Sequence, residues 1–293
     1  MPAGRIWLVI PTLNEAENVE RIVRAAAAQL ERIAPGEHRL LVVDDHSKDG
    51  TGEIVERLGA ELGTVEVLRR RGRGLAGAYL AGFEHALAGG AELVIVMDAD
   101  YSHDPKYLPA LVEAAAENDL VLGSRYVKGG EILDWPRLRR FLSRGGSRYA
   151  RWLLGVEIRD LTGGYRCIRR EVLEAVEPST LRSQGYVFNI ELTYRTLLLG
   201  YRVAEVPIVF QDRTIGKSKI SLPIALEALL LVPALRFQHL QRKLPAEPGA
   251  RRRGRLMRAT SSKQPPAESR PPAAEEAVPA ANAGAGHTGT GAD

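Results

Sequence analysis

The sequence predicts an α/β fold, with a mostly parallel central sheet flanked by helices. Short apolar runs alternate with longer helical stretches from residue 6 to residue 122, a pattern typical of βαβ units. Most of these runs are rich in β-branched residues and Leu, as strands buried on both faces are. Polar clusters follow three of the runs, at the edge where parallel sheets bind their ligands.

The individual elements are expected in the following order. Five strands are predicted at residues 6–10, 40–43, 65–68, 93–97 and 120–122. Helices are predicted between them at residues 15–33, 51–62, 75–87 and 106–117. The second half is less regular, with helices expected at residues 135–154, 169–176 and 188–199, and a last strand at 201–210.

Composition limits the classes of protein that fit. The 293 residues are 45% hydrophobic, enough for one sizeable α/β domain with an appendage. The net charge of +4 suits a phosphate substrate or an anionic membrane surface, but is too small to indicate nucleic-acid binding. The single cysteine excludes an internal disulfide and fits a reducing compartment. Residues 6–10 are too short a run for a signal peptide, so a cytoplasmic location is expected.

Three regions are expected along the chain. Residues 1–219 form the globular domain, residues 220–244 an amphipathic helical segment, and residues 245–293 a disordered tail rich in Ala, Pro and Gly. No run reaches the roughly 18–20 apolar residues that a membrane-spanning helix needs. Residues 222–232, with the basic residues that follow, are expected to lie in a membrane interface, on the protein's own core, or on a membrane-protein partner.

The strongest chemical signal is Asp98-Ala99-Asp100 at the end of the run 93–97. Two carboxylates one residue apart at a strand end are able to turn toward one divalent cation. Their hard oxygen ligands suit Mg²⁺ or Mn²⁺, and diphosphate oxygens usually complete the shell. The alternative is a solvated turn, which the presence of the other polar clusters disfavours.

Two further polar clusters follow the first and second predicted strands. A carboxylate of Asp44-Asp45 is placed to accept hydrogen bonds from a base or a ribose. Asp49 and Thr51 are expected to cap the following helix. Glu15 is either a nucleotide contact or an acidic residue that faces a helix N-terminus.

These clusters, in this order, resemble family 2 glycosyltransferases of the GT-A fold. The segments that carry the resemblance are residues 11–15, 42–51 and 98–100. Later segments narrow it to the dolichol- or polyprenol-phosphate mannosyltransferases, namely residues 123–126, 161–166, 185–188 and 213–219. The resemblance covers about residues 5–240 and marks residues 1–219 as a catalytic domain. It implies GDP-mannose as donor, a polyprenyl phosphate as acceptor, and an enzyme on the cytoplasmic face of a membrane.

The resemblance also implies roles for individual residues. The contacts to the nucleotide-sugar would be Pro11, Leu13, Glu15, Val43, Asp45, Asp98, Ala99, Asp100, Arg125, Arg213 and Lys219. The metal would be held by Asp98 and Asp100, with Ser102 where some relatives have Gln. The catalytic set would be Asp100, Arg213, Arg139 and Ser143. Arg139 and Ser143 are four residues apart, on one face of the predicted helix.

A phosphate acceptor simplifies the expected chemistry. A sugar hydroxyl would need a base to remove its proton, whereas a phosphate monoester has a second pKa of about 6 and is mostly a dianion near neutral pH. We therefore expect in-line attack with inversion and no catalytic base. His46, His85 and His103 are expected to be loop or helix-surface residues, and Cys167 to be a packing residue rather than a nucleophile.

Two other functions compete with this interpretation. The same fold could use UDP-glucose or another nucleotide-sugar, although many such relatives carry two C-terminal membrane spans that this chain lacks. A nucleic-acid-binding protein is suggested by the basic residues 251–255. That patch lies in the predicted tail without interleaved aromatic residues, and the paired carboxylates have no place in such a protein.

Overall fold

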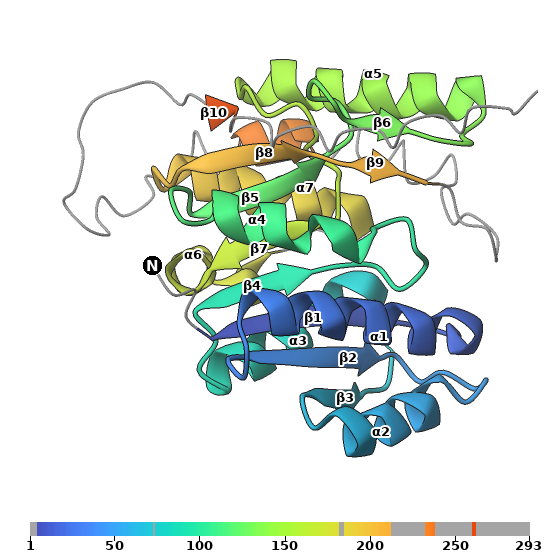
Figure 1. Ribbon diagram of the computed structural model, residues 1–293. Coiled ribbons are helices and arrows are strands. Elements are labelled where there is room, and N and C mark those ends of the chain that lie inside the picture. The colour runs from blue at the N-terminus through green and yellow to red at the C-terminus, as the bar shows by residue number, and fades with distance from the viewer. Residues whose placement is uncertain (1–4, 73, 182–184, 212–231, 238–259, 262–293) are drawn as a thin grey trace, which may run out of the picture. The chain divides into compact units, whose positions relative to one another are not determined.

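The computed structural model describes residues 5–72, 74–181, 185–211, 232–237 and 260–261 (Figure 1). The described strands form an eight-stranded sheet in the order β10-β8-β5-β7-β4-β1-β2-β3, and a two-stranded sheet of β6 and β9. All neighbours are parallel except β7, which is antiparallel to both β4 and β5. The predicted mostly parallel sheet is therefore confirmed.

The strands of the large sheet are β1 (Ile6–Thr12), β2 (His38–Asp44), β3 (Val65–Arg69), β4 (Leu93–Val96), β5 (Leu120–Ser124), β7 (Arg166–Arg169), β8 (Val203–Pro207) and β10 (Thr260–Ser261). The small sheet consists of β6 (Glu131–Ile132) and β9 (Val209–Phe210). The described helices are α1 (Ala16–Ile33), α2 (Thr51–Leu62), α3 (Gly74–Ala88), α4 (Leu108–Ala114), α5 (Arg137–Leu154), α6 (Arg170–Val176) and α7 (Gly185–Leu198). Short 3₁₀ helices lie at Pro105–Tyr107 and Pro178–Thr180.

The sheet separates two hydrophobic clusters. Along β1, Leu8 and Ile10 face the cluster that contains the apolar side of α1, whereas Trp7 and Val9 face the cluster that contains α3 and α7. Successive side chains of a strand point to opposite faces, so a strand covered on both faces must be apolar throughout. All residues of β1 except Pro11 are buried. Helices on both faces hold the carboxyl ends of β1, β2 and β4 at one edge.

Several boundaries differ from the predicted ones. β7 was not predicted, because its four residues, Arg-Cys-Ile-Arg, show no strand pattern when read alone. The predicted strand 201–210 is divided into β8 and β9, because β8 pairs with β5 and β9 pairs with β6. The predicted helix 106–117 begins with a 3₁₀ turn and ends at Ala114.

The C-terminal predictions remain predictions. Most of the amphipathic segment 220–244 and nearly all of the tail 245–293 lie outside the described residues. Within the part of the chain that the structure describes, no helix is both long and apolar enough to cross a membrane.

Candidate active site

The loops after β1 and β2 are joined by reciprocal hydrogen bonds. The Asn14 backbone N–H donates to Ser47 Oγ at 2.8 Å, and the Lys48 N–H donates to Asn14 Oδ1 at 2.9 Å. Asn14 has a positive φ of 56°, a conformation that Asn tolerates better than most residues. The two clusters that the sequence suggested as nucleotide contacts are therefore held together as one surface.

Asp49 fastens this surface to two helices. Its Oδ1 accepts from the Thr51 backbone N–H at 3.1 Å, at the start of α2. The N-cap position itself is Gly50 and Thr51 is the first helical residue, so Asp49 binds the first turn from one residue before the cap. Its Oδ2 also accepts from the Ala16 N–H at 2.9 Å, at the start of α1. Burial raises the pKa of Asp49, but the hydrogen bonds from Thr51 and Ala16 outweigh burial and lower it below the usual value. Glu15 immediately precedes α1, and its Oε2 accepts from Asn18 Nδ2.

The two neighbouring carboxylates after β2 have different surroundings. Asp44 is buried, and its Oδ1 accepts from Ser47 Oγ and from Thr12 Oγ1, so it stabilises the loop. Asp45 Oδ1 lies 3.3 Å from Arg70 Nη1 and has no hydrogen-bond partner among the described residues. Of the two, Asp45 is therefore the better placed to accept a hydrogen bond from a ligand.

Further predicted nucleotide contacts lie at the same edge of the sheet. Pro11 of β1 and Val43 of β2 are partners in the parallel register, so they lie side by side. Val43 is buried and Leu13 is exposed, which makes Leu13 the apolar side chain available to a flat base. The structure thus brings Pro11, Leu13, Val43 and Asp45 to one edge, as predicted.

Asp98 and Asp100 follow β4, at the same edge of the sheet. Asp98 is part-exposed, and Tyr79 Oη donates to its Oδ1 at 3.5 Å. Asp100 is buried, and its Oδ1 accepts from the backbone N–H and the Oγ of Ser102, at 3.1 and 2.5 Å. Ser102 therefore orients the Asp100 carboxylate with the hydrogen of its hydroxyl. Ala99 is buried between the two carboxylates.

The donor set at this edge fits a hard divalent cation. It consists of the carboxylate oxygens of Asp98 and Asp100, and the Ser102 hydroxyl donates a hydrogen bond to Asp100. Among the described residues there is no group of three or more His, Cys, Asp or Glu side chains able to hold a metal. Mg²⁺ is commonly bound by one or two carboxylates together with substrate phosphates and waters, so two carboxylates are sufficient for such a site.

His103 lies in a loop, as predicted, but it is buried rather than at the surface. His103 is 3% exposed and stacks on the Tyr165 ring, with 5.0 Å between the ring centroids. Its Nδ1 accepts a hydrogen bond from the Asp98 backbone N–H at 3.0 Å. Burial lowers the pKa of His103, although Asp98 and Asp100 oppose the shift. The neutral ring therefore positions the backbone of Asp98. His46 is an exposed loop residue and His85 lies in the last turn of α3, as expected.

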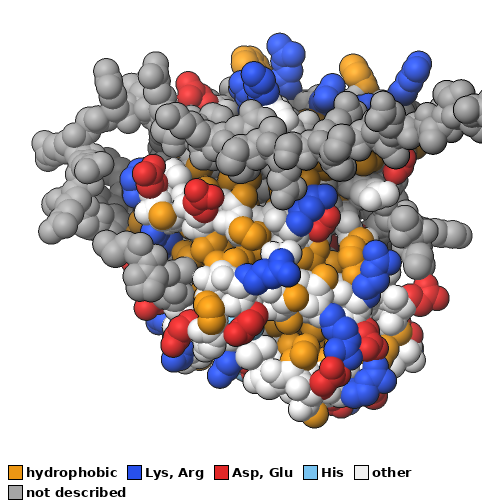
Figure 2. Space-filling model, viewed as in Figure 1, with side chains coloured by type: hydrophobic (Ala, Val, Ile, Leu, Met, Phe, Trp, Pro, Cys, Tyr) orange, Lys and Arg blue, Asp and Glu red, His pale blue; other side chains and the backbone are white. Residues whose placement is uncertain are grey.

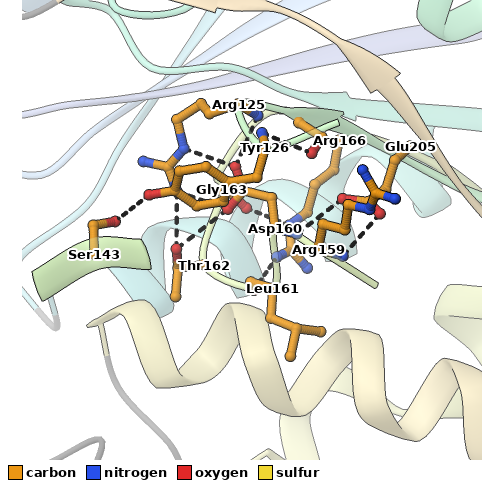
Figure 3. A network of polar contacts seen from close by, with 11 residues as sticks. Arg125, Tyr126, Ser143, Arg159, Asp160, Leu161, Thr162, Gly163, Arg166 and Glu205 are labelled. Atoms are coloured by element: carbon orange, nitrogen blue, oxygen red, sulfur yellow. Dashed lines mark hydrogen bonds and ion pairs between the residues drawn. The ribbon is translucent and has the colours of Figure 1, made fainter. Parts of the chain in front are cut away.

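Arg125 is engaged in a buried ion pair that the sequence did not indicate. Its Nε and Nη2 donate to the two oxygens of Asp160, both at 2.7 Å, and Nη2 also donates to Thr162 Oγ1 (Figure 3). Both side chains of the pair are nearly inaccessible to solvent. Burial raises the pKa of Asp160, but the Arg125 guanidinium outweighs it and holds that pKa below the usual value. The geometry gives Arg125 a structural role, and its predicted contact with phosphate stays a prediction.

The hydrogen-bond network extends from Asp160 to the neighbouring residues 159–163. The backbone N–H groups of Arg159 and Asp160 both donate to the Glu205 carboxylate at 2.8 Å. Arg166 is buried and donates to the carbonyl oxygens of Leu161 and Gly163 (Figure 3). Burial lowers the pKa of Arg166 to about 10, so the side chain still carries its charge near neutral pH. Residues 159–163 are therefore fixed by charged partners on both sides.

This network reaches the paired carboxylates through Gly164. A Cβ at this position would lie 3.3 Å from His103 Cε1 and 3.7 Å from Asp98 Oδ1. The absence of a side chain allows the backbone of residues 161–166 to pass close to the predicted metal edge. Sequence reasoning missed Asp160, although it stands directly before the segment 161–166 that carried part of the resemblance.

Arg139 and Ser143 lie on α5 as predicted, but in different surroundings. The Arg139 guanidinium lies over the Trp135 ring, 4.0 Å from its centroid. Ser143 Oγ accepts from Tyr126 Oη at 2.6 Å, and Tyr126 directly follows Arg125, so this bond joins α5 to the buried network (Figure 3). Arg213 and Lys219 lie outside the described residues.

Comparison with known proteins decides the family. The model of "Glycosyl transferase family 2" matches residues 7–177. The chain belongs to glycosyltransferase family 2. It is 42% identical over 245 residues to an undecaprenyl-phosphate mannosyltransferase of Micrococcus luteus, covering 82% of this chain and 99% of the relative. It is also 46% identical over 223 residues to a polyprenol monophosphomannose synthase of Mycolicibacterium smegmatis, covering 75% of this chain and 82% of that protein.

Solved structures show the same fold at low sequence identity. A mannosyltransferase from Pyrobaculum calidifontis, solved with GDP-Man and Mn²⁺, superposes with a TM-score of 0.52 at 19% identity, over 73% of this chain and 58% of that longer one. A glucosyl-3-phosphoglycerate synthase from Mycobacterium tuberculosis, solved with Mg²⁺ and UDP, superposes with a TM-score of 0.55 at 21% identity. The match covers 78% of this chain and 79% of that one. The expected GT-A fold of this glycosyltransferase is thereby confirmed.

The only cysteine of the glycosyltransferase lies inside the sheet. Cys167 of β7 pairs with Ile95 and with Val121 in the register of the neighbouring strands and is fully buried. Burial raises the pKa of its thiol to about 12, so the side chain stays protonated and uncharged near neutral pH. Its prediction as a packing residue is confirmed.

Proposed function

We propose that the protein transfers mannose from GDP-mannose to a polyprenyl phosphate, with inversion, and that it uses Mg²⁺ or Mn²⁺. The observation that carries the proposal is the similarity to two polyprenyl-phosphate mannosyltransferases, one of them matched over 99% of its length. The paired carboxylates after β4 and the adjoining edge of β1 and β2 agree with such a reaction. Mn²⁺ and GDP-Man are bound together in the Pyrobaculum structure.

Each part of the edge has a task in this reaction. Asp45, with Pro11 and Leu13 beside it, would bind the nucleoside. Asp98 and Asp100 would hold the cation, with Ser102 fixing Asp100. The cation, when bound, would neutralise charge on the departing diphosphate. Glu15, Val43, Ala99, Arg125, Arg213 and Lys219 remain the further predicted contacts to the nucleotide-sugar.

No catalytic base is required for the chemical step. The acceptor phosphate is mostly a dianion near neutral pH, so Arg139 and Ser143 need only orient it and screen its charge. Two other polar groups near the paired carboxylates hold the backbone around them. His103 accepts from the Asp98 N–H, and Asp104 accepts from the Lys106 N–H at 2.9 Å. We therefore expect the nucleophile to attack the anomeric carbon directly, so that an α-linked donor gives a β-linked product.

The acceptor also determines where the enzyme works. A polyprenyl chain is held in a bilayer, so the proposal includes peripheral attachment to the cytoplasmic face of a membrane or to a membrane-protein partner. Residues 220–244 remain the segment that the sequence suggests for this attachment.

A transfer assay tests the proposal. The full-length protein is incubated with radiolabelled GDP-mannose or UDP-glucose, polyprenyl phosphate and Mg²⁺ or Mn²⁺, and the lipid phase is counted. Mannose should enter the lipid phase from GDP-mannose, and EDTA should stop its entry. Transfer from UDP-glucose alone would replace the donor in the proposal and leave the family assignment unchanged.

A further inference from the structure

A basic region of the glycosyltransferase lies along α5, and its lining does not include the carboxylates proposed to hold the metal. An open pocket of about 500 Å³ lies along α5, and neither Asp98, Asp100 nor Asp45 lines it. Four arginine side chains line its walls, namely Arg144, Arg148, Arg151 and Arg159. Tyr126, whose hydroxyl bonds Ser143, closes one side.

The positive charge of this pocket is not balanced by nearby carboxylates. Among the described residues, none of the four guanidinium groups forms an ion pair, and α5 contains no Asp or Glu. Asp160, which follows Arg159, is bonded to Arg125, and Glu205 accepts two backbone N–H groups. Glu157, two residues before Arg159, is exposed and is not among the residues that line the pocket. Like charges gathered at one place repel one another, and a bound anion would relieve that repulsion.

Ser147 gives an independent indication of an occupant. It lines the same pocket, is 2% exposed, and its hydroxyl has no hydrogen-bond partner among the described residues. Buried hydroxyl groups in folded proteins nearly always have a partner. Ser147 and Arg151 are four residues apart and so lie on one face of α5. A ligand that accepts hydrogen bonds from both would complete the site.

The surroundings of the pocket are partly apolar. Trp152 lines it and is 79% exposed, and Phe141 and Leu142 of the same helix are also exposed. Figure 2 shows Lys and Arg side chains beside large hydrophobic ones along the upper edge, where α5 lies in Figure 1. Arginine mixed with aromatic side chains is typical of surfaces that meet lipid head groups.

We propose that this pocket binds a phosphate group, presented by an anionic lipid head group or free in solution. The guanidinium fork of Arg matches pairs of phosphate oxygens, and the Ser147 hydroxyl would donate one further hydrogen bond. This site is separate from the metal and nucleotide contacts, and it goes beyond the proposed transfer reaction. Its occupant is bound and is not consumed.

Vesicle binding by the full-length protein tests the lipid source. Phosphatidylcholine vesicles with and without phosphatidylglycerol are floated with the wild type, with Arg148→Gln/Arg151→Gln, and with Arg32→Gln/Arg202→Gln. The control pair removes two exposed arginines from other surfaces. The pocket variant should bind anionic vesicles about 30-fold more weakly, because each basic residue near such a surface contributes about 1 kcal/mol. The control should change binding by less than about twofold.

A second arm tests phosphate in solution. Inorganic phosphate should raise the melting temperature of the wild type more than sodium chloride of equal ionic strength does. This extra rise should be smaller for the pocket variant. Ser147→Ala, which changes no charge, should weaken phosphate binding about tenfold or more by removing one hydrogen bond to a charged group. Stabilisation by phosphate without vesicle binding would assign the site to a soluble phosphate.

The outcomes are independent of the proposed reaction. Neither arm needs GDP-mannose or an acceptor, so the pocket and the transfer activity are able to fail separately. Equal loss of vesicle binding in the pocket and control variants, together with no specific effect of phosphate, would overturn the proposal. So would a collapse of transfer in detergent by Arg148→Gln/Arg151→Gln, since the pocket would then belong to the acceptor site.

Discussion

The two halves of the glycosyltransferase build their polar sites in different ways. In the first half, the loops after β1 and β2 are joined by hydrogen bonds between backbone groups and short polar side chains, and most of these bonds lie near solvent. In the second half, Arg125 and Asp160 form an ion pair whose members are 7% and 0% exposed. Both arrangements join residues 33–35 positions apart in the chain, so they differ in exposure to solvent and in charge rather than in sequence distance.

The difference indicates how each half tolerates change. A lost hydrogen bond near solvent is partly replaced by water. A lost partner in a buried ion pair leaves a charge in a medium of low dielectric constant. Substitutions in the first half should therefore alter ligand binding with modest losses of stability, and substitutions in the network of Arg125 and Asp160 should lower the stability of the fold.

The largest effect on activity is expected at the edge after β4. Asp100→Ala should lower transfer about 1000-fold or more, since a bound cation contributes several kcal/mol to stabilising charge in a transition state. Asp104→Asn, on the same connection, should retain nearly all activity. Radiolabelled transfer measures both, with melting curves to check folding. Normal turnover of a folded Asp100→Ala protein in EDTA would exclude the metal role.

The largest effect on stability is expected at Asp160. Asp160→Asn should lower the free energy of unfolding by about 3–5 kcal/mol, because Arg125 would stay buried without its counter-charge. Glu174→Gln breaks the exposed ion pair of Glu174 with Arg170 and should cost about 0.5 kcal/mol or less. Urea unfolding followed by circular dichroism measures both. Equal losses for the two variants would contradict the importance given to burial of the Arg125–Asp160 pair.

Sequence reasoning succeeded where structure is local. The alternating strands and helices of the first half were predicted nearly to the residue, and α2 has the predicted bounds of Thr51 and Leu62. The sequence also predicted that Pro11, Leu13, Val43 and Asp45 lie at one edge, because they stand at or just after the ends of predicted parallel strands. β7 was missed because it is defined by antiparallel pairing with β4 and β5, which its own four residues do not reveal.

The same limit explains what was missed at the candidate site. The ion pair of Arg125 and the burial of His103 were not predicted, because the residues beside them in the chain do not indicate their partners. Asp160 lies 35 positions from Arg125, and Tyr165, which stacks on His103, comes from the same distant segment. A buried ion pair or a buried histidine of this kind is identified from the folded structure, not from the neighbouring sequence.

The pH dependence of stability should distinguish the two halves further. The Arg125 guanidinium holds the pKa of Asp160 below the usual 3.8 of an aspartate side chain. The ion pair therefore contributes stability above about pH 4, and this contribution is lost as pH falls through the pKa of the folded state. The stability difference between wild type and Asp160→Asn should be constant near neutral pH and shrink below about pH 4. A difference that stays constant down to pH 2 would mean that the Asp160 charge adds nothing.

The smallest effect is expected for the cap that joins α1 to α2. Asp49→Ala removes acceptors for Ala16 and Thr51 and should lower the free energy of unfolding by about 1–2 kcal/mol, the upper part of the range for a capping residue. Glu37→Ala, at an exposed position, should change it by less than about 0.5 kcal/mol. Because Asp49 also fixes the loops around Asp45, its loss should weaken binding of GDP-mannose in calorimetry. A loss of stability as large as that of Asp160→Asn would contradict the contrast between the halves, because Asp49 is exposed.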